Sequence, residues 1–216
     1  MNGVVRAAIV NLGNVAASWD IVGSGDFNHD GRSDILWQNT SGARAIWIMN
    51  GTVFGHSLSL PSVSPSWDIV GAADFDRDGH SDILWQHTSG ARAIWLMNGG
   101  VRRGSASLGT VSPSWDIVGT GDFNGDGSAD ILWQDNSGTR AIWFMNGTVR
   151  VSSVILGRVA TSWHIAGSGD FNRDGKADIL WQDTAGHRAV WLMNGRTRIG
   201  SANLGTVSTI WDIRNF

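Results

Sequence analysis

The chain repeats itself with a fixed period of 48 residues. Five tryptophans mark this period, each 48 positions after the last: Trp19, Trp67, Trp115, Trp163 and Trp211. Every interval contains the same parts in the same order, namely S-W-[DH]-I, an acidic loop, D-I-L-W-Q and R-A-[IV]-W-x-M-N-G. A fixed period of this size predicts a solenoid, a propeller or an array, because one such unit cannot bury its apolar surface alone.

Composition narrows the class of protein. The repeat favours a single continuous domain over residues 1–216, and the absence of cysteine excludes disulfides. A formal charge of −3 gives no reason to expect attraction to nucleic acid or to a membrane. We therefore expect no nucleic-acid partner. The sequence has no apolar run near the ~20 residues of a membrane span and no signal-peptide pattern, so we also expect no membrane insertion.

The first full unit reads as four short strands. We predict them at Asp20–Phe27, Asp34–Gln38, Arg44–Asn50 and about Ser57–Leu60, from alternating apolar residues bounded by turn residues. Neither face of these strands is purely polar, which indicates that neighbouring sheets cover both. Four antiparallel strands in each unit of this length predict an all-β fold, a β-propeller with one unit per blade.

Glycines refine this prediction. Gly23 and Gly25 lie inside the first strand, where glycine marks a close approach by another part of the chain, as on the innermost strand of a crowded ring. Asn50-Gly51 is the two-residue signal of a tight hairpin, since both residues tolerate positive φ.

The repeat also sets the expected boundaries. The full blades are predicted at residues 19–66, 67–114, 115–162 and 163–210, with residues 1–18 as the outer strand of a partial blade and 211–216 as the start of an inner strand. Three arrangements satisfy this count: a small closed ring of four blades, a reduced fifth blade, or association between chains. We favour a homo-oligomer, because exposed sheet edges tend to pair.

The loop D-x-[ND]-x-D-G-x-x-D is the strongest functional signal. All 19 acidic residues are aspartates, and thirteen of them lie in the four loops. Side chains at positions 1, 3, 5 and 9, with the main-chain carbonyl at position 7, supply at least five oxygens to a hard cation. The predicted ligands are Asp26, Asn28, Asp30, Arg32 and Asp34; Asp74, Asp76, Asp78, His80 and Asp82; Asp122, Asn124, Asp126, Ser128 and Asp130; and Asp170, Asn172, Asp174, Lys176 and Asp178.

We expect about one Ca²⁺ in each full repeat. The different residue types at position 7 fit a main-chain ligand, and nothing implies the water-rich octahedral site of Mg²⁺. An EF-hand is excluded, because its position 12 falls on Trp37, inside a predicted strand. The alternative is an Asx-rich turn without metal. Each loop, however, carries three or four negative charges that repel one another unless a cation is present.

The stretch G-D-F-N-x-D-G-x-x-D-I-L-W resembles the FG-GAP/VCBS-type repeats of integrin α-subunit heads, certain fungal lectins and many secreted bacterial proteins. The similarity covers nearly the whole chain. It implies a β-propeller with calcium in the hairpin between the first two strands of each blade, an extracellular setting and a binding role.

The disc face opposite the acidic loops offers a candidate ligand site. An aromatic ring beside planar hydrogen-bonding groups suits a sugar, and we expect the Trp37 class of tryptophans to be more exposed than the Trp19 class. The alternative is that these residues pack between blades; Trp47 and its equivalents are predicted core. The predicted ligand-binding residues are Trp37, Gln38, Arg44, Trp85, Gln86, Arg92, Trp133, Gln134, Arg140, Trp181, Gln182 and Arg188.

Catalysis is not expected. The six histidines fall at unrelated places in their repeats, and the chain has no Cys, Tyr or Glu to act as a repeated nucleophile. The sequence therefore favours a calcium-stabilised, multivalent carbohydrate-binding propeller whose partners are glycans. Two alternatives stay open: a protein-binding adhesion module resembling the integrin head, and a passive structural repeat segment or artificial repeat array.

Overall fold

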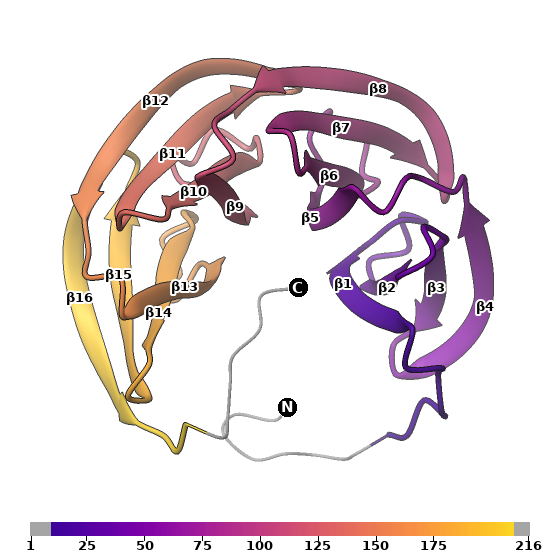
Figure 1. Ribbon diagram of the computed structural model, residues 1–216, viewed down its shortest axis with the longest axis horizontal. Helices are drawn as coiled ribbons and strands as arrows, with labels where there is room; N and C mark the ends of the chain where they lie inside the picture. The colour runs from indigo at the N-terminus through magenta and orange to yellow at the C-terminus, as the bar shows by residue number, and fades with distance from the viewer. Residues whose placement is uncertain (1–9, 210–216) are drawn as a thin grey trace.

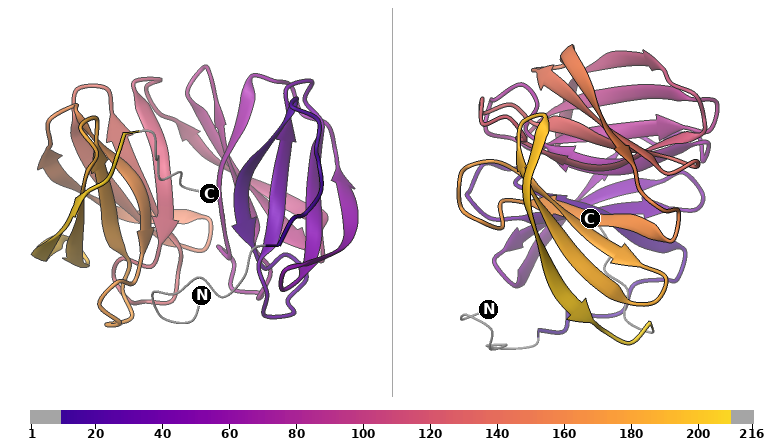
Figure 2. Two further views of the ribbon diagram at one scale, coloured as in Figure 1. Left: turned by 90° about the horizontal axis from the view of Figure 1, so that it is seen from below. Right: turned by 90° about the vertical axis from the view of Figure 1, so that its left-hand side faces the viewer.

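The structure, a computed structural model, describes residues 10–209 and contains four separate four-stranded antiparallel sheets. The sheets are arranged radially around a common centre, with the first strand of each nearest to it (Figure 1). Seen from the side, the strands run from one face of the disc to the other (Figure 2). The predicted all-β propeller with one blade per repeat is thereby confirmed.

The strands follow the chain in order within each blade. Blade 1 contains β1 (Trp19–Gly25), β2 (Asp34–Asn39), β3 (Arg44–Asn50) and β4 (Val53–Leu60). Blade 2 contains β5 (Trp67–Ala73), β6 (Asp82–His87), β7 (Ala91–Asn98) and β8 (Val101–Thr110). Blade 3 contains β9 (Trp115–Gly121), β10 (Asp130–Asp135), β11 (Thr139–Asn146) and β12 (Val149–Arg158). Blade 4 contains β13 (Trp163–Gly169), β14 (Asp178–Asp183), β15 (His187–Asn194) and β16 (Thr197–Thr206).

The hairpin between β3 and β4 differs from its prediction in one respect. Asn50 pairs with Val53, so the turn consists of Gly51 and Thr52, and only Gly51 has a positive φ, of 64°. A two-residue turn with glycine first matches the twist of the flanking strands. Asn50 therefore ends a strand instead of occupying the turn, and β4 begins earlier than the predicted Ser57.

The innermost strands are as crowded as their glycines predict. A Cβ atom on Gly25 would lie 2.5 Å from the hydroxyl oxygen of Ser81 in blade 2. One on Gly121 would lie 2.6 Å from the Cβ of Ala177 in blade 4. Both distances are too short for a side chain to fit, so glycine is required where the loop of the next blade crosses the strand.

The predictions for the chain ends are tested only in part. Residues 10–18, the described part of the predicted outer strand, form no strand. Residues 1–9 of that strand, and the inner-strand start predicted at residues 211–216, lie outside the described residues.

Apolar side chains between the blades form the core. Each sheet has a trailing face, which packs against the following blade, and a leading face, which packs against the preceding one. Leu36 and Ile46 on the trailing face of blade 1 contact a cluster containing Ile83 and Trp85 on the leading face of blade 2. Equivalent clusters join blade 2 to blade 3 and blade 3 to blade 4. Burying each such side chain stabilises the fold by about 1.5–3 kcal/mol.

The contacts between innermost strands follow the same order. β1 packs beside β5, β5 beside β9 and β9 beside β13, while the described parts of β13 and β1 share no comparable contact. Blades 1 and 4 therefore form the two ends of an arc (Figure 1). Within the described residues, no helix has the length and apolarity needed to cross a membrane.

Candidate metal loops and interblade grooves

The acidic loops connect the first and second strands of each blade and fold around their first aspartate. In blade 1, Asp26 accepts hydrogen bonds from the main-chain N–H of Asp30 at 3.1 Å and of Gly31 at 2.7 Å. The other three loops repeat both bonds. The fourth position is left-handed in every copy, with φ of 61° at His29, and so is the glycine at position 6, with φ of 78° at Gly31. These two kinks turn the chain back on itself.

The ninth position ties the loop to the sheet. Asp34 is fully buried, and its carboxylate accepts hydrogen bonds from the N–H of Phe27 at 3.0 Å and of Met49 at 2.9 Å. Asp82, Asp130 and Asp178 make the same two bonds. This carboxylate therefore fastens the hairpin to the third strand, whether or not it also binds a metal as predicted.

Burial raises the pKa of three ninth-position carboxylates, those of Asp34, Asp82 and Asp130. Burial raises the pKa of Asp82 and of Asp130 to about 6, against the opposing effect of their main-chain hydrogen bonds. The negative charges of neighbouring aspartates add to the increase. A divalent cation beside them would favour the ionised form.

The residue at position 3, and the donor that reaches the aspartate at position 5, differ between blade 2 and the other blades. In blade 1 the amide of Asn28 donates to Asp30 Oδ2 at 3.2 Å, and blades 3 and 4 repeat this bond. In blade 2 the third position is Asp76, which has no amide to donate. The guanidinium of Arg103 instead hydrogen-bonds Asp76 Oδ2 and lies 3.1 Å from Asp78 Oδ2.

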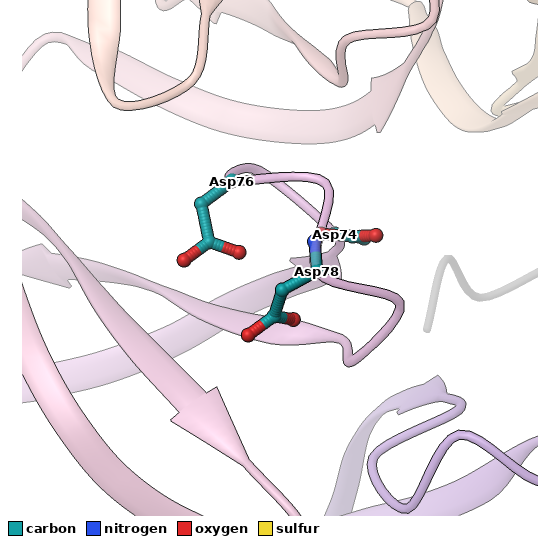
Figure 3. A group of neighbouring side chains, drawn as sticks. All are labelled: Asp74, Asp76 and Asp78. Carbon is teal, nitrogen blue, oxygen red and sulfur yellow. Dashed lines mark hydrogen bonds between the residues drawn. The ribbon is translucent and has the colours of Figure 1, made fainter.

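The blade 2 loop has the donor set of a hard-cation site. One carboxylate oxygen from each of Asp74, Asp76 and Asp78 lies within 4.8 Å of the other two (Figure 3). Asp76 Oδ1 is buried without a hydrogen-bond partner in the part of the chain that the structure describes. Three neighbouring carboxylates and an unsatisfied oxygen fit a divalent cation of the calcium type.

The predicted main-chain ligands at position 7 contact the same loops. Their N–H groups donate to the aspartate at position 5 over 2.8–3.0 Å. Whether their carbonyls bind a cation stays a prediction. These residues are Arg32, His80, Ser128 and Lys176.

Loops of successive blades bond directly to each other. The N–H of Ser81 donates to the main-chain carbonyl of Asp26 at 2.7 Å, and that of Ala177 donates to the carbonyl of Asp122 at 2.7 Å. Between blades 2 and 3, Arg77 donates to the carbonyl of Asp126 at 3.3 Å. The four loops thus form one connected row on one face of the disc. The turns between the third and fourth strands share this face. In blade 4, the N–H of Gly195 in this turn donates to the main-chain carbonyl of Phe123, in the acidic loop of blade 3, at 2.8 Å.

The predicted sugar-binding tryptophans are buried. The exposed fraction is 7% for Trp37 and 1% for each of Trp85, Trp133 and Trp181, whereas the Trp19 class is half-buried. The prediction that the Trp37 class is the more exposed is therefore wrong. The rings of Trp85, Trp133 and Trp181 lie inside the interblade contacts, where the preceding blade covers them. Trp37, in blade 1, packs against Trp47 of its own blade.

The predicted arginines are buried with them. The Arg44 guanidinium lies 5.5 Å from the ring centre of Trp85 and donates to the main-chain carbonyl of Trp67 at 2.8 Å. Arg92 and Arg140 make the same two contacts with the blade that follows each of them. Arg188, in blade 4, is also buried. A stacked and hydrogen-bonded guanidinium at this depth fixes one blade against the next.

The predicted glutamines bridge the blades. Gln38 donates to Asp68 Oδ1 at 2.9 Å and accepts from the N–H of Ile69 at 2.9 Å. Gln86 makes both equivalent bonds to blade 3, and Gln134 accepts from blade 4 at 3.3 Å. Gln182, in blade 4, accepts from Arg188 within its own blade at 3.1 Å. The structure gives all these side chains a role in joining strands and blades, and ligand binding by them stays a prediction.

A different set of tryptophans is partly accessible. Of the tryptophans predicted as core, Trp95 is buried, Trp143 and Trp191 are half-buried but pack against the core clusters, and Trp47 is half-buried. Each stands opposite a serine on the outermost strand, as Trp191 stands opposite Ser201. Trp95 has the same kind of neighbour, Ser105, and is buried, so the serine alone does not decide how much of the ring is accessible.

Cavities form beside these tryptophans. One of about 350 Å³ in blade 4 is lined by Trp163, His187, Trp191, Ser201 and Asn203. The equivalent cavity in blade 1, of about 260 Å³, is lined by Trp19, Trp37, Trp47, Ser57 and Ser59. A groove of about 540 Å³ between blades 2 and 3 is lined by Leu108, Thr110, Trp143 and Arg150.

Comparison with known proteins agrees with the repeat. The FG-GAP-like repeat family matches residues 26–85, 74–133 and 122–181, which together cover most of the chain. No curated protein matches.

Comparison with solved structures also finds similar chains. Raptor from Chaetomium thermophilum aligns at a TM-score of 0.51 with 9% identity, over 90% of this chain and 17% of its own. BBS1N, from a complex with ARL6DN, aligns at 0.41 with 14% identity, over 78% of this chain and 48% of its own. This chain spans about half or less of the length of those proteins. The matched repeats and the four blades show that the chain belongs to the FG-GAP-like repeat family.

Proposed function

We propose that the protein is a calcium-stabilised, multivalent carbohydrate-binding propeller that acts by binding and not by catalysis. Membership of the FG-GAP-like repeat family supports a binding or adhesion module. The observation that carries the choice of carbohydrate is the recurrence of a half-buried tryptophan beside hydroxyl groups in cavities of blades 1, 3 and 4.

The blade 4 cavity illustrates the chemistry. Trp163 and Trp191 supply apolar ring surface, while His187, Ser201 and Asn203 supply hydrogen-bonding groups. A pyranose has the matching pattern, with C–H groups on one face and hydroxyls at its edge. The cavity volume, about 350 Å³, lies in the range of small-ligand sites.

Repetition adds strength to weak single sites. Cavities at equivalent places in blades 1 and 4, and the groove between blades 2 and 3, give one molecule several places to engage a glycan-coated surface. Linked sites of this kind exceed the affinity of one site by a large factor without any new contact.

Calcium in the acidic loops belongs to the same proposal. The converging carboxylates of blade 2 and the repeated loop geometry support it. Asp74, Asp76 and Asp78 would hold the ion in blade 2, and equivalent residues would hold it elsewhere. Affinity on the order of 10⁻⁴–10⁻³ M suits an extracellular protein, which is the setting we propose.

A glycan array in calcium buffer tests the carbohydrate proposal. We expect hits within one sugar class, and His187→Ala with Asn203→Ala should weaken binding several-fold by removing one site of several. Thr197→Ala, at the other end of β16, is the matched control and should bind like the parent. No hit across broad sugar classes would reject the proposal and leave a protein-binding adhesion module as the better reading.

Chelation tests the metal. Removing divalent cations should lower the Tm markedly, because each loop then retains three or four unbalanced carboxylates. Native mass spectrometry should count about one calcium per repeat in the loaded protein. An unchanged melting curve would contradict a structural role for the cation.

A further inference from the structure

Arg103 replaces a donor that the acidic loop of blade 2 lacks. In blades 1, 3 and 4 an asparagine amide donates to the fifth-position aspartate. In blade 2 the third position is Asp76, and Arg103 contacts both Asp76 and Asp78. Its guanidinium therefore bridges two carboxylates that would otherwise face each other without a donor between them.

The substitution and the arginine occur together in one repeat only. At the positions equivalent to Arg103 the other blades have Gly55, Val151 and Ile199, and at those equivalent to Asp76 they have asparagine. The added negative charge is thus matched by an added positive charge 27 residues later in the same blade.

Other arginine side chains near the loops make longer contacts with the carboxylates. Arg32 lies 3.5 Å from one carboxylate, that of Asp30, and Arg77 lies 3.6 Å from one carboxylate of the next loop, that of Asp126. Only Arg103, among the described arginines, bridges two aspartates of one loop.

We propose that Arg103 is a tethered counter-ion for the blade 2 loop, which keeps this loop folded without a divalent cation and competes with the cation for the carboxylates of Asp76 and Asp78. Only the second part of this proposal, the competition with a cation, rests on the proposed calcium binding. A metal ion that binds both carboxylates must displace the guanidinium, because the two positive charges repel. Arg103 is half exposed, so it has room to leave.

A double-mutant cycle in chelator tests the first half. Arg103→Gln should lower the Tm of the parent but leave the Tm of an Asp76→Asn variant nearly unchanged, because the asparagine restores the amide donor of the other blades. Equal effects of Arg103→Gln in the two backgrounds would overturn the proposed role. Arg102→Gln is the neighbouring control, since Arg102 stacks on Trp95 and should show no coupling to Asp76.

Calorimetric titration with calcium tests the second half. Arg103→Gln should tighten one site by up to about fivefold, the factor expected for loss of a partly exposed ion pair. Unchanged or weaker binding would overturn the competition. A parent that binds no calcium would reject the proposed function, whereas the coupling measured in chelator would still decide the role of Arg103.

Transplanting the pair gives an independent check. Asn124→Asp with Val151→Arg places both residues in blade 3. The double variant should melt higher in chelator than Asn124→Asp alone, because the arginine compensates the added carboxylate. A double variant no more stable than the single one would contradict the proposal.

Discussion

Equivalent residues of the repeat lie in two kinds of surroundings, inside the contacts between neighbouring blades and at the two ends of the arc. Ile69, Ile117 and Ile165 on the leading faces of blades 2 to 4 are 5–6% exposed, whereas Ile21 on blade 1 is 39% exposed. Phe27, Phe75 and Phe123 beside the acidic loops are fully buried, whereas Phe171 on blade 4 is 50% exposed. A residue of this repeat is buried by a neighbouring repeat, and its own sequence does not decide its burial.

Leucines and polar groups show the same contrast. Leu60 on the outer strand of blade 1 is 6% exposed, while Leu204 in blade 4 is 54% exposed. Gln38 and Gln86 bond to the blade after them, while Gln182 bonds to Arg188 in its own blade. At the two ends of the arc, the described residues therefore expose surfaces that are buried in the contacts between blades.

The strongest test compares two phenylalanines. Phe75→Ala should lower the free energy of unfolding by about 3–5 kcal/mol, because it leaves a cavity between blades 2 and 3. Phe171→Ala, at the equivalent position of blade 4, should cost less than about 1 kcal/mol, since water already reaches that ring. Urea denaturation measures both, and equal losses would mean that Phe171 is covered in solution, by association or by other parts of the chain.

A second comparison removes a polar bridge. Gln86→Ala should lower the free energy of unfolding by about 1–3 kcal/mol, because the N–H of Ile117 and the carboxylate of Asp116 lose their partner. Asp116→Ala alone should cost less, since this carboxylate is exposed. If the two changes cost the same and add without coupling, the bridge does not join the blades.

A smaller effect is expected from removing single methyl groups. Ile117→Val should cost about 0.5–1.5 kcal/mol, because a void remains inside the contact of blades 2 and 3. Ile21→Val should leave the free energy of unfolding nearly unchanged. Thermal melts of the pair measure the difference, and a larger loss for Ile21→Val would contradict the open face of blade 1.

A further comparison changes the pH and not the sequence. Because burial raises the pKa of Asp82 and Asp130 in the central blades from 3.8 to about 6, the folded state binds their protons more tightly than the unfolded state. Their contribution to stability is full below about pH 4 and is lost as the pH rises through about 6. Asp126 opposes this trend, since hydrogen bonds from Ser128 and Asn124 outweigh burial and lower its pKa.

Urea denaturation in chelator at pH 4, 5 and 6 measures the slope. We expect stability to fall over this interval without metal and to rise with it when calcium is present, because the cation favours ionised carboxylates. A rise in chelator would show that the hydrogen bonds to these aspartates outweigh their burial.

The sequence predicts the local structure well because the signals are local. The period, the turn residues and the alternation within each unit place four strands, and β3 begins and ends at the predicted Arg44 and Asn50. The turn of the acidic loop is equally local, since the hydrogen bonds among its first seven positions join residues at most five positions apart.

Burial of the candidate ligand site was not predictable in the same way. Whether Trp37 or Trp47 reaches the surface depends on how far the neighbouring blade extends over each, which one repeat does not encode. The bridge from Arg103 to Asp76 likewise depends on which residue of β8 passes over the loop. The motif specifies the ligands, but contacts between elements decide which of them are accessible.

The row of bonded loops links events on that face of the disc. Because the carbonyl of Asp26 holds the N–H of Ser81, and that of Asp122 holds the N–H of Ala177, tightening one loop restrains its neighbour. If calcium binds as proposed, its binding in one loop should favour binding in the next, with a Hill coefficient above one. The propeller would then sense the ion as a single unit, and its response would be sharper than that of four independent hairpins.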